Sequence, residues 1–183
     1  MMIDIEPNFI KMWNYQVENN PHSYIDLNLL LPPKLHMLMT SDGSLTRHNA
    51  ILNSENITLE IINEFYSIGQ ETLIAVNQTY TKRSIWLVSN KDKKIFAQSY
   101  WQIIPQEKSF LNLNKPIGKA LIQTEINMHR NLFSIYFGYC NDIEKQFNHN
   151  GPLWGRSYKI TPGCLSPIFI HEVFSPSLIK TIQ

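Results

Sequence analysis

The sequence predicts an α+β domain built on a six-stranded, mainly antiparallel sheet with helices packed on it. Two observations carry this prediction. Segments rich in β-branched and aromatic residues recur from residue 57 onwards, as is typical of strands. Helical spacing is confined mostly to the first third of the chain and to one stretch between the third and fourth strands, so helices and strands are largely segregated. The six strands are expected at 57–66, 83–89, 95–104, 131–139, 153–160 and 167–174.

The expected helices are placed by breakers and caps. A first helix is expected over 9–17, and Pro32-Pro33 opens a second. After a turn at 41–44, Ser44 suits the N-cap of a short helix that runs to residue 52. Residues 115–123 have helical spacing with Pro116 in the first turn, where proline is tolerated. The polar residues 90–93 join two apolar runs and predict a hairpin.

Composition limits the function classes. The chain has 183 residues, 43% of them hydrophobic and 17% charged, and a net charge of +1, which indicates one globular domain over 1–183. The scattered basic residues argue against a nucleic-acid surface, and no apolar run is long enough to span a bilayer. The start shows neither a signal nor a transit peptide. Two cysteines, Cys140 and Cys164, fit a reducing compartment and are expected to be small buried hydrophobes, although one disulfide stays open.

Three ionisable residues fall on apolar strand faces, because side chains alternate sides along a strand. Arg83 shares its side with Ile85 and Leu87, Arg156 with Trp154, Tyr158 and Ile160, and Glu172 with Ile168, Ile170 and Phe174. A buried charge costs several kcal/mol unless it is paired and hydrogen-bonded, so each of the three needs a partner.

Two interpretations of these charges stay open when only parity is considered, that is, the alternation of side chains between the two sides of a strand. In the first, Arg83 or Arg156 forms a buried ion pair with Glu172, or reaches solvent at a strand end. In the second, two guanidiniums and one carboxylate leave a surplus positive charge for an anionic ligand, since arginine offers the fork that a carboxylate fits.

Other chemistries find no support. The stretch at 115–119 lacks the earlier glycine and the Ser/Thr of a phosphate loop. The six histidines show no metal-ligand spacing, so no metal site is expected. No G-x-S-x-G elbow exists. His171 lies on the opposite strand face from Glu172 and receives no role.

Five blocks, taken in order, resemble chorismate lyase, and most closely its divergent branch in cyanobacteria and algal plastids. They are Asp42-Gly43-Ser44-Leu45-Thr46, Arg83-Ser84-Ile85-Trp86-Leu87, Lys115-Pro116-Ile117-Gly118, Leu153-Trp154-Gly155-Arg156 and His171-Glu172-Val173-Phe174. The match covers most of 27–178 and leaves about the first 25 residues unmatched. It implies the six-stranded sheet with a closed internal ligand cavity.

The resemblance also implies a reaction and a site. Chorismate would be converted to 4-hydroxybenzoate and pyruvate without a cofactor, as the entry to a quinone ring. The carboxylate-binding arginine of the family falls on Arg83, and its carboxylate near the product hydroxyl falls on Glu172. Backbone amides that hold the ring carboxylate fall at Leu45 and Ile117, and Arg156 is the second basic candidate, for the enolpyruvyl carboxylate.

Departures and rival functions complete the prediction. Leu45 stands where the bacterial enzymes have methionine, and the segment 97–105 differs from theirs in length. A ligand-sensing module related to the effector domains of bacterial transcription regulators, or a structural protein that kept the fold, are the alternatives. We expect a monomer with a small-molecule substrate, located in a plastid or in the cytoplasm of a cyanobacterium.

Overall fold

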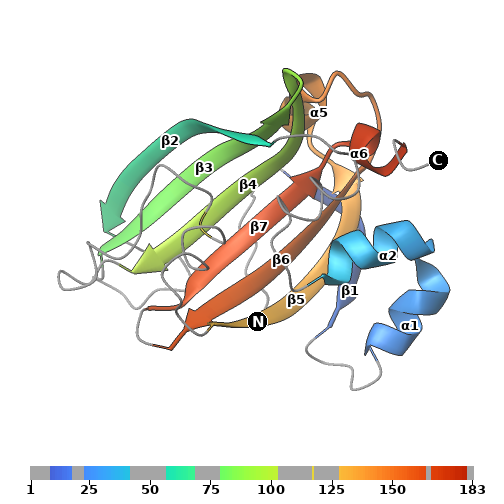
Figure 1. The fold of residues 1–183 in the computed structure, drawn as a ribbon, viewed down its shortest axis with the longest axis horizontal. Helices are drawn as coiled ribbons and strands as arrows, with labels where there is room; N and C mark the ends of the chain where they lie inside the picture. The colour runs from blue at the N-terminus through green and yellow to red at the C-terminus, as the bar shows by residue number, and fades with distance from the viewer. Residues whose placement is uncertain are drawn as a thin grey trace.

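The fold is a single seven-stranded sheet in which every neighbouring pair of strands is antiparallel (Figure 1). This computed structural model describes residues 9–17, 23–41, 57–68, 79–102, 117, 128–163 and 166–180. Its strands are β1 (Ile10–Gln16), β2 (Thr58–Ile68), β3 (Thr79–Ser89), β4 (Asp92–Gln102), β5 (Met128–Tyr139), β6 (Leu153–Pro162) and β7 (Ile168–Phe174). Its helices are α1 (Ser23–Leu30), α2 (Pro33–Thr40), α5 (Asn141–Gln146) and α6 (Pro176–Lys180).

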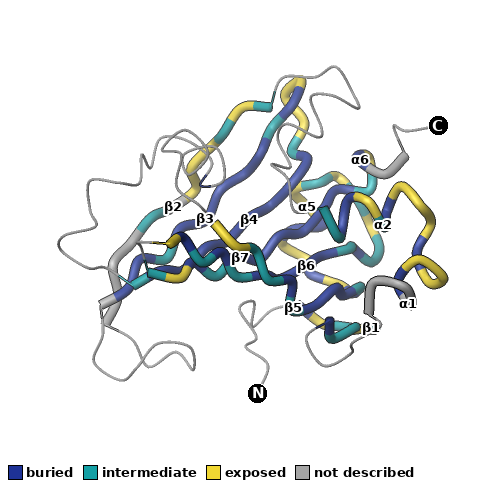
Figure 2. The backbone as a smooth tube through the Cα atoms, turned by 60° about the horizontal axis from the view of Figure 1, so that its bottom comes forward, coloured by how far each residue is buried: buried dark blue, intermediate teal, exposed yellow. Residues whose placement is uncertain are grey.

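The strand order is β1-β5-β6-β7-β4-β3-β2. Two three-stranded meanders, β2-β3-β4 and β5-β6-β7, therefore join where β4 pairs with β7, and β1 extends the sheet beside β5. Central strands of such a sheet are covered on both faces, and Figure 2 shows β3, β4, β6 and β7 as mostly buried while several connections are exposed. The join between β4 and β7 places residues of the two meanders beside one another.

The predicted count of six strands is wrong, because the described residues contain seven. All six expected strands are present, and the seventh, β1, lies where a helix was expected over 9–17. A nine-residue window is too short for apolar spacing to separate the two periods. Trp13 and Tyr15 point to the core from alternate positions of β1, which is how aromatic residues pack on a strand.

The helices are confirmed in part. The helix opened by Pro32-Pro33 is α2, in which proline stands at the first helical positions. Three short helices, α1, α5 and α6, were not foreseen. The expected helix at 44–52 lies outside the described residues, and of the one at 115–123 the structure describes only Ile117, which is helical.

The backbone of the turn between β3 and β4 accounts for the residues found there. Asn90 and Lys91 both have positive φ, 50° and 68°, as a two-residue hairpin turn of the primed type requires. β4 then begins at Asp92 and turns the Lys94 side chain inward, where it is 7% exposed and its Nζ lies 3.5 Å from Asp92 Oδ2. The predicted hairpin is therefore confirmed, with Asn90 and Lys91 exposed at the turn and Lys94 buried on the strand.

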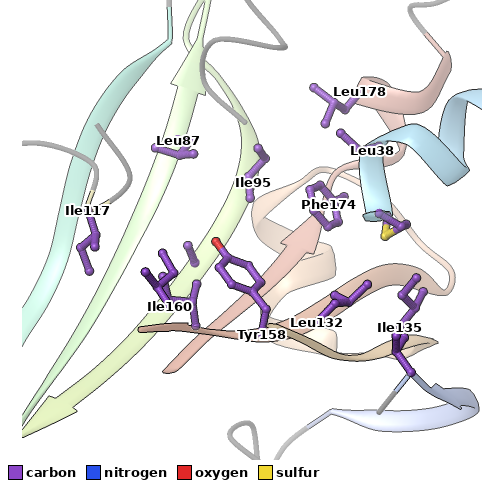
Figure 3. Packing of buried hydrophobic residues seen from close by; sticks show 14 of the residues in the cluster. Leu38, Leu87, Ile95, Ile117, Leu132, Ile135, Tyr158, Ile160, Phe174 and Leu178 are labelled. Atoms are coloured by element: carbon purple, nitrogen blue, oxygen red, sulfur yellow. The ribbon is translucent and has the colours of Figure 1, made fainter. Parts of the chain in front are cut away.

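Each face of the sheet carries its own apolar cluster. The first face packs against residues of α1, α2 and α6, among them Leu27, Leu38 and Leu178. Figure 3 shows Leu38 of α2 and Leu178 of α6 beside Phe174 of the sheet. The opposite face packs against α5 through Ile143 and buries Trp86. Cys140 is a buried free thiol in that second cluster, as expected, and Cys164 lies outside the described residues.

The opposite face is organised around Tyr136, whose ring lies over Gly155 on the neighbouring strand. A Cβ added at Gly155 would lie 2.2 Å from Cζ of Tyr136, so only glycine lets the ring lie there. The Tyr136 hydroxyl is 2.7 Å from Nε2 of His171, and the two rings stack with centroids 5.1 Å apart. Burial, together with the positive charge of Lys11, lowers the pKa of His171 to about 3, so this histidine is neutral in the folded protein at neutral pH.

Gly155→Ala should destabilise the protein by about 3 kcal/mol, because overpacking a core of this kind typically costs 1–3 kcal/mol and Tyr136 must also leave His171. The measurement is the free energy of unfolding from a urea titration. The same substitution made in a Tyr136→Ala background should cost much less, since the ring is gone. An equal cost in both backgrounds would contradict this packing.

Because of His171, the free energy of unfolding should also decrease as the pH is lowered. The unfolded histidine titrates near 6.5, above the folded pKa of about 3, so the unfolded chain takes up the proton first. The contribution is complete above pH 6.5 and is lost progressively towards pH 3. Between pH 7 and pH 5 the stability difference between wild type and His171→Gln should shrink by about 2 kcal/mol. Carboxylates common to both proteins cancel, and a difference that stays constant with pH would exclude this effect.

Candidate functional site

The antiparallel register places all three predicted charged residues on the first face of the sheet. Cross-strand partners share a face, and Ile85, Ala97, Glu172 and Arg156 pair in sequence across β3, β4, β7 and β6. Arg83 starts the adjacent row on the same face, paired with Ser99. The face assignments made from parity are therefore confirmed for all three.

Glu172 is a buried carboxylate with two fixed hydrogen-bond donors. It is 6% exposed. Its Oε2 accepts a hydrogen bond from Nε of Arg156 at 2.8 Å, and its Oε1 accepts one from the hydroxyl of Tyr158 at 2.9 Å. The guanidinium supplies the opposite charge that a buried carboxylate requires, and the two donors together fix the orientation of the carboxylate plane.

Tyr158 responds to this environment. Its pKa is raised well above the ordinary value of a phenol, first by burial and then by the negative charge of Glu172. Its hydroxyl thus keeps its proton and acts as a donor to Glu172. Figure 3 shows the Tyr158 side chain leaving the sheet among apolar neighbours, with its hydroxyl at the tip.

Arg156 connects this pair to the end of α2. It is 1% exposed, and its Nη1 lies 3.1 Å from the carbonyl oxygens of Leu38 and Met39 and 3.2 Å from that of Ser41. The last carbonyls of a helix lack intrahelical donors, so a buried cation there satisfies them and opposes the helix dipole. Arg156 therefore joins β6, β7 and α2 around one charge.

Arg83 lies on β3, away from that pair. It is 1% exposed, and its Nε is 3.7 Å from Oε2 of Glu64, its cross-strand partner on β2. Burial lowers the pKa of Arg83, and Glu64 opposes that shift in part. The contacts described for Arg83 and Glu172 join each to a different partner, so the two are not brought together as one ion pair.

The separation of Arg83 and Glu172 follows from the register. They stand two strands and two residues apart on one face, which is about 12 Å between Cα atoms at ordinary strand spacing. Two inward-pointing side chains at this separation can approach opposite ends of a single ring-sized molecule.

The structure bears out the first interpretation of the charges for Arg156. A buried pair exists between Arg156 and Glu172, as the first interpretation had it. Arg83 stays separate from that pair on the same face but lies 3.7 Å from Glu64, so the surplus positive charge of the second interpretation stays a prediction. The substrate-binding role expected for Arg156 stays a prediction, while the contacts that the structure shows for it are made within the protein.

Two residues of the cluster were missed by sequence reasoning. Tyr158 was recognised only as an apolar neighbour of Arg156, because parity does not show where a hydroxyl ends. Arg130 on β5 was overlooked: its Cζ lies 4.4 Å from the centre of the Tyr158 ring, and its Nη1 donates to the carbonyl of Ser41 at 3.2 Å. Arg130 lies one residue before the strand expected at 131–139, and a bulge between Leu132 and Ser134 shifts the register of β5, so the alternation of side chains could not place it.

The backbone positions are described in part. Ile117 is 8% exposed and belongs to the apolar cluster of the first face, near Leu87 in Figure 3. Leu45 lies outside the described residues. The amide roles of both therefore stay predictions.

Neither a metal site nor a membrane helix is found in the part of the chain that the structure describes. No three His, Cys, Asp or Glu side chains gather there as metal ligands would. No helix in the same part is both long and apolar enough to cross a bilayer. His171 lies on the opposite face, as expected, and takes no part in the cluster around Glu172.

A hollow on the opposite face is separate from this cluster. Its volume is about 770 Å³, and it lies between α5 and the strands β2, β3 and β4, where Trp86 and Phe96 form part of its floor and Lys93 and Lys145 part of its rim. None of the residues that line it belongs to the cluster around Glu172.

Relatives in sequence extend over almost the whole chain. The uncharacterised protein ycf21 of Porphyra purpurea is 32% identical over 172 residues, which cover 93% of this chain and 96% of the relative. The protein of the same name from Antithamnion sp. is 35% identical over 170 residues, covering 90% of each chain.

Solved structures share the fold at low identity. PhnF from Mycobacterium smegmatis superposes with a TM-score of 0.59 at 8% identity, over 75% of this chain and 66% of PhnF, just under two thirds of its length. The effector domain of PhnF alone gives a TM-score of 0.57 at 8% identity, over 76% of this chain and 92% of the domain. At this identity the likeness shows a common fold.

One family description matches most of the sequence. It is described as "Chorismate pyruvate-lyase Rv2949c-like" and matches residues 39–182, a range that contains Arg83, Arg156 and Glu172. On this match, and on the ycf21 relatives, the chain belongs to the Rv2949c-like chorismate pyruvate-lyase family.

Proposed function

We propose that the protein is a chorismate lyase, which converts chorismate to 4-hydroxybenzoate and pyruvate without a cofactor. One observation carries the proposal: in a member of this family, a buried arginine and a buried, doubly anchored carboxylate stand about 12 Å apart on one face of the sheet. That arrangement fits a ring with an acid at one end and a hydroxyl at the other.

Arg83 binds the ring carboxylate in this proposal. A guanidinium removed from water gains most from a bidentate anion, and the lowered pKa of Arg83 shows that burial is unfavourable for its charge. A bound carboxylate offsets that cost. The backbone amides of Leu45 and Ile117 complete the carboxylate site, as the family resemblance implies.

Glu172 acts at the other end of the ring. The reaction breaks the ether bond to the enolpyruvyl group and removes a proton from the adjacent ring carbon, after which the ring is aromatic. A carboxylate whose orientation is fixed by Arg156 and Tyr158 can accept that proton or hydrogen-bond the ring hydroxyl. Because chorismate is already close to aromatic, orientation and charge neutralisation supply most of what the reaction needs.

A ligand sensor is the second candidate. The observation in its favour is the fold shared with the PhnF effector domain. A sensor of the same face would bind an aromatic acid through Arg83 but would not turn chorismate over. The first experiment is therefore incubation of the purified protein with chorismate, followed by chromatography for 4-hydroxybenzoate: formation of product supports the lyase, and binding without product supports the sensor.

The setting of the activity is part of the proposal. The relatives carry a ycf name, which is given to reading frames of chloroplast genomes, and they come from algae. We infer a plastid location, or the cytoplasm if the source is a cyanobacterium, with 4-hydroxybenzoate supplied to a plastoquinone-type pathway. A monomer that binds chorismate, and no nucleic acid, is what we expect of such an enzyme.

Arg83→Ala should weaken 4-hydroxybenzoate binding by a factor of about 10 to 150, which corresponds to the 1.5–3 kcal/mol of a charge-assisted hydrogen bond. The measurement is calorimetric titration of the folded variant. Lys82→Ala is the matched control, because it removes a neighbouring charge from the opposite face, where Lys82 lies over the Tyr100 ring. Binding by Arg83→Ala as tight as that of the control would refute the role of Arg83.

Glu172→Gln should lower kcat by a factor of about 10² to 10⁴, the usual contribution of a general acid or base. The variant should also be less stable, because the amide keeps one acceptor oxygen in place of the two that Arg156 and Tyr158 use and leaves the Arg156 charge unpaired. Steady-state kinetics and circular dichroism on the same samples check both parts. If Glu172 were only a structural partner of Arg156, the folded fraction of the variant would keep the kcat of wild type.

A further inference from the structure

The substrate carries two negative charges, and the proposed site accounts for one of them. Chorismate has a ring carboxylate and an enolpyruvyl carboxylate, whereas 4-hydroxybenzoate keeps only the first. A second cation that faces the enolpyruvyl group would therefore distinguish substrate from product. The inference that follows rests on the proposed function and deepens it.

Two guanidiniums flank Tyr158 and are the candidates for this second cation. Cζ of Arg130 lies 4.4 Å from the centre of the Tyr158 ring, and Cζ of Arg156 lies 5.0 Å from it. Both positive charges act on the Tyr158 hydroxyl, because both lower its pKa against the larger effects of burial and Glu172. Tyr158 thus marks a point where two cations and the Glu172 carboxylate converge.

Arg156 and Arg130 differ in how deeply they are buried, and this difference favours one of them as the second cation. Arg156 is 1% exposed, and its guanidinium faces Glu172 and three carbonyl oxygens at the end of α2. Arg130 is half-buried, at the border between the core and the surface. A dianion that arrives from solvent reaches Arg130 without displacing a buried ion pair, whereas binding to Arg156 would have to compete with Glu172 for the same charge.

The position of Arg130 on the sheet suits the second carboxylate. It stands on β5, four strands from Arg83 on β3, or about 19 Å along a flat sheet. Its cross-strand partner is Ile160, whose side chain belongs to the first face. At this separation two inward-pointing arginine side chains can reach opposite ends of one ring-sized dianion, with Glu172 on the strand midway.

We propose that Arg130 is a substrate-binding residue, which holds the enolpyruvyl carboxylate of chorismate and so distinguishes the substrate from its product. Tyr158 keeps the guanidinium plane in place through its ring, and the carbonyl of Ser41 fixes one edge through Nη1. Arg156 is then a positioning residue, which orients Glu172 and anchors the end of α2.

The test compares two ligands on one variant. Arg130→Gln should raise the KM for chorismate at least about tenfold, the low end for loss of a charge-assisted contact, while the dissociation constant for 4-hydroxybenzoate changes less than about twofold. Arg130→Lys should fall between Gln and wild type for chorismate, since it keeps the charge and loses the fork. Lys159→Gln is the matched control: it removes one charge from β6 on the opposite face, where Lys159 lies over the Phe133 ring, and should leave both constants unchanged.

The possible outcomes distinguish failure of the role proposed for Arg130 from failure of the proposed lyase function. If Arg130→Gln weakens both ligands equally, or neither, Arg130 only supports the end of α2 and the inference is wrong, even though wild type turns chorismate over. If wild type binds chorismate without turnover, the lyase fails, and dissociation constants in place of KM still decide the role of Arg130. If wild type binds neither ligand, both proposals fall.

Discussion

The structure depends on how one buried negative charge is held. Glu172 lies on β7, where the two meanders of the sheet meet, and its carboxylate accepts hydrogen bonds from Arg156 and Tyr158. Removing one partner of such a pair typically costs about 3–5 kcal/mol, so the three residues have to fold together. Through the carbonyl contacts of Arg156, the end of α2 is included in the same unit. An apolar residue at position 172 would satisfy the core more simply, which favours a chemical reason for the carboxylate.

The two faces of the sheet differ in what they bury. The opposite face is closed by close packing, in which Tyr136 lies over Gly155 and the neutral His171 stacks against Tyr136. The first face carries buried charges among aliphatic side chains, an arrangement that costs stability unless a ligand or a partner offsets it. Adjacent residues of β7, His171 and Glu172, thus lie on opposite faces: His171 packs within the fold, and Glu172 carries the chemistry that we propose.

The sheet and the faces of its charged residues could be predicted from the sequence, because side chains alternate between the two faces of a strand with a period of two residues. The six expected strands exist, and parity assigned Arg83, Arg156 and Glu172 to the correct face. It failed where period two breaks or is too short to read. β1 covers only seven residues and was expected to be helical, while Arg130 lies one residue before the expected start of β5 and on the far side of a bulge. Parity also predicts the face on which a side chain lies but not its partner. The pairing of Arg156 with Glu172 and of Arg83 with Glu64 could be seen only once the register of the strands was known.

The central claim is that Arg83 and Glu172 hold opposite ends of one aromatic acid on the first face. A crystal structure of the protein with 4-hydroxybenzoate tests it most directly. The account predicts the ligand between β3 and β7, with its carboxylate on the Arg83 guanidinium and its hydroxyl towards Glu172. A ligand bound instead in the hollow beside α5, or a first face in which Arg83 turns to pair with Glu172 and leaves no room, would contradict it.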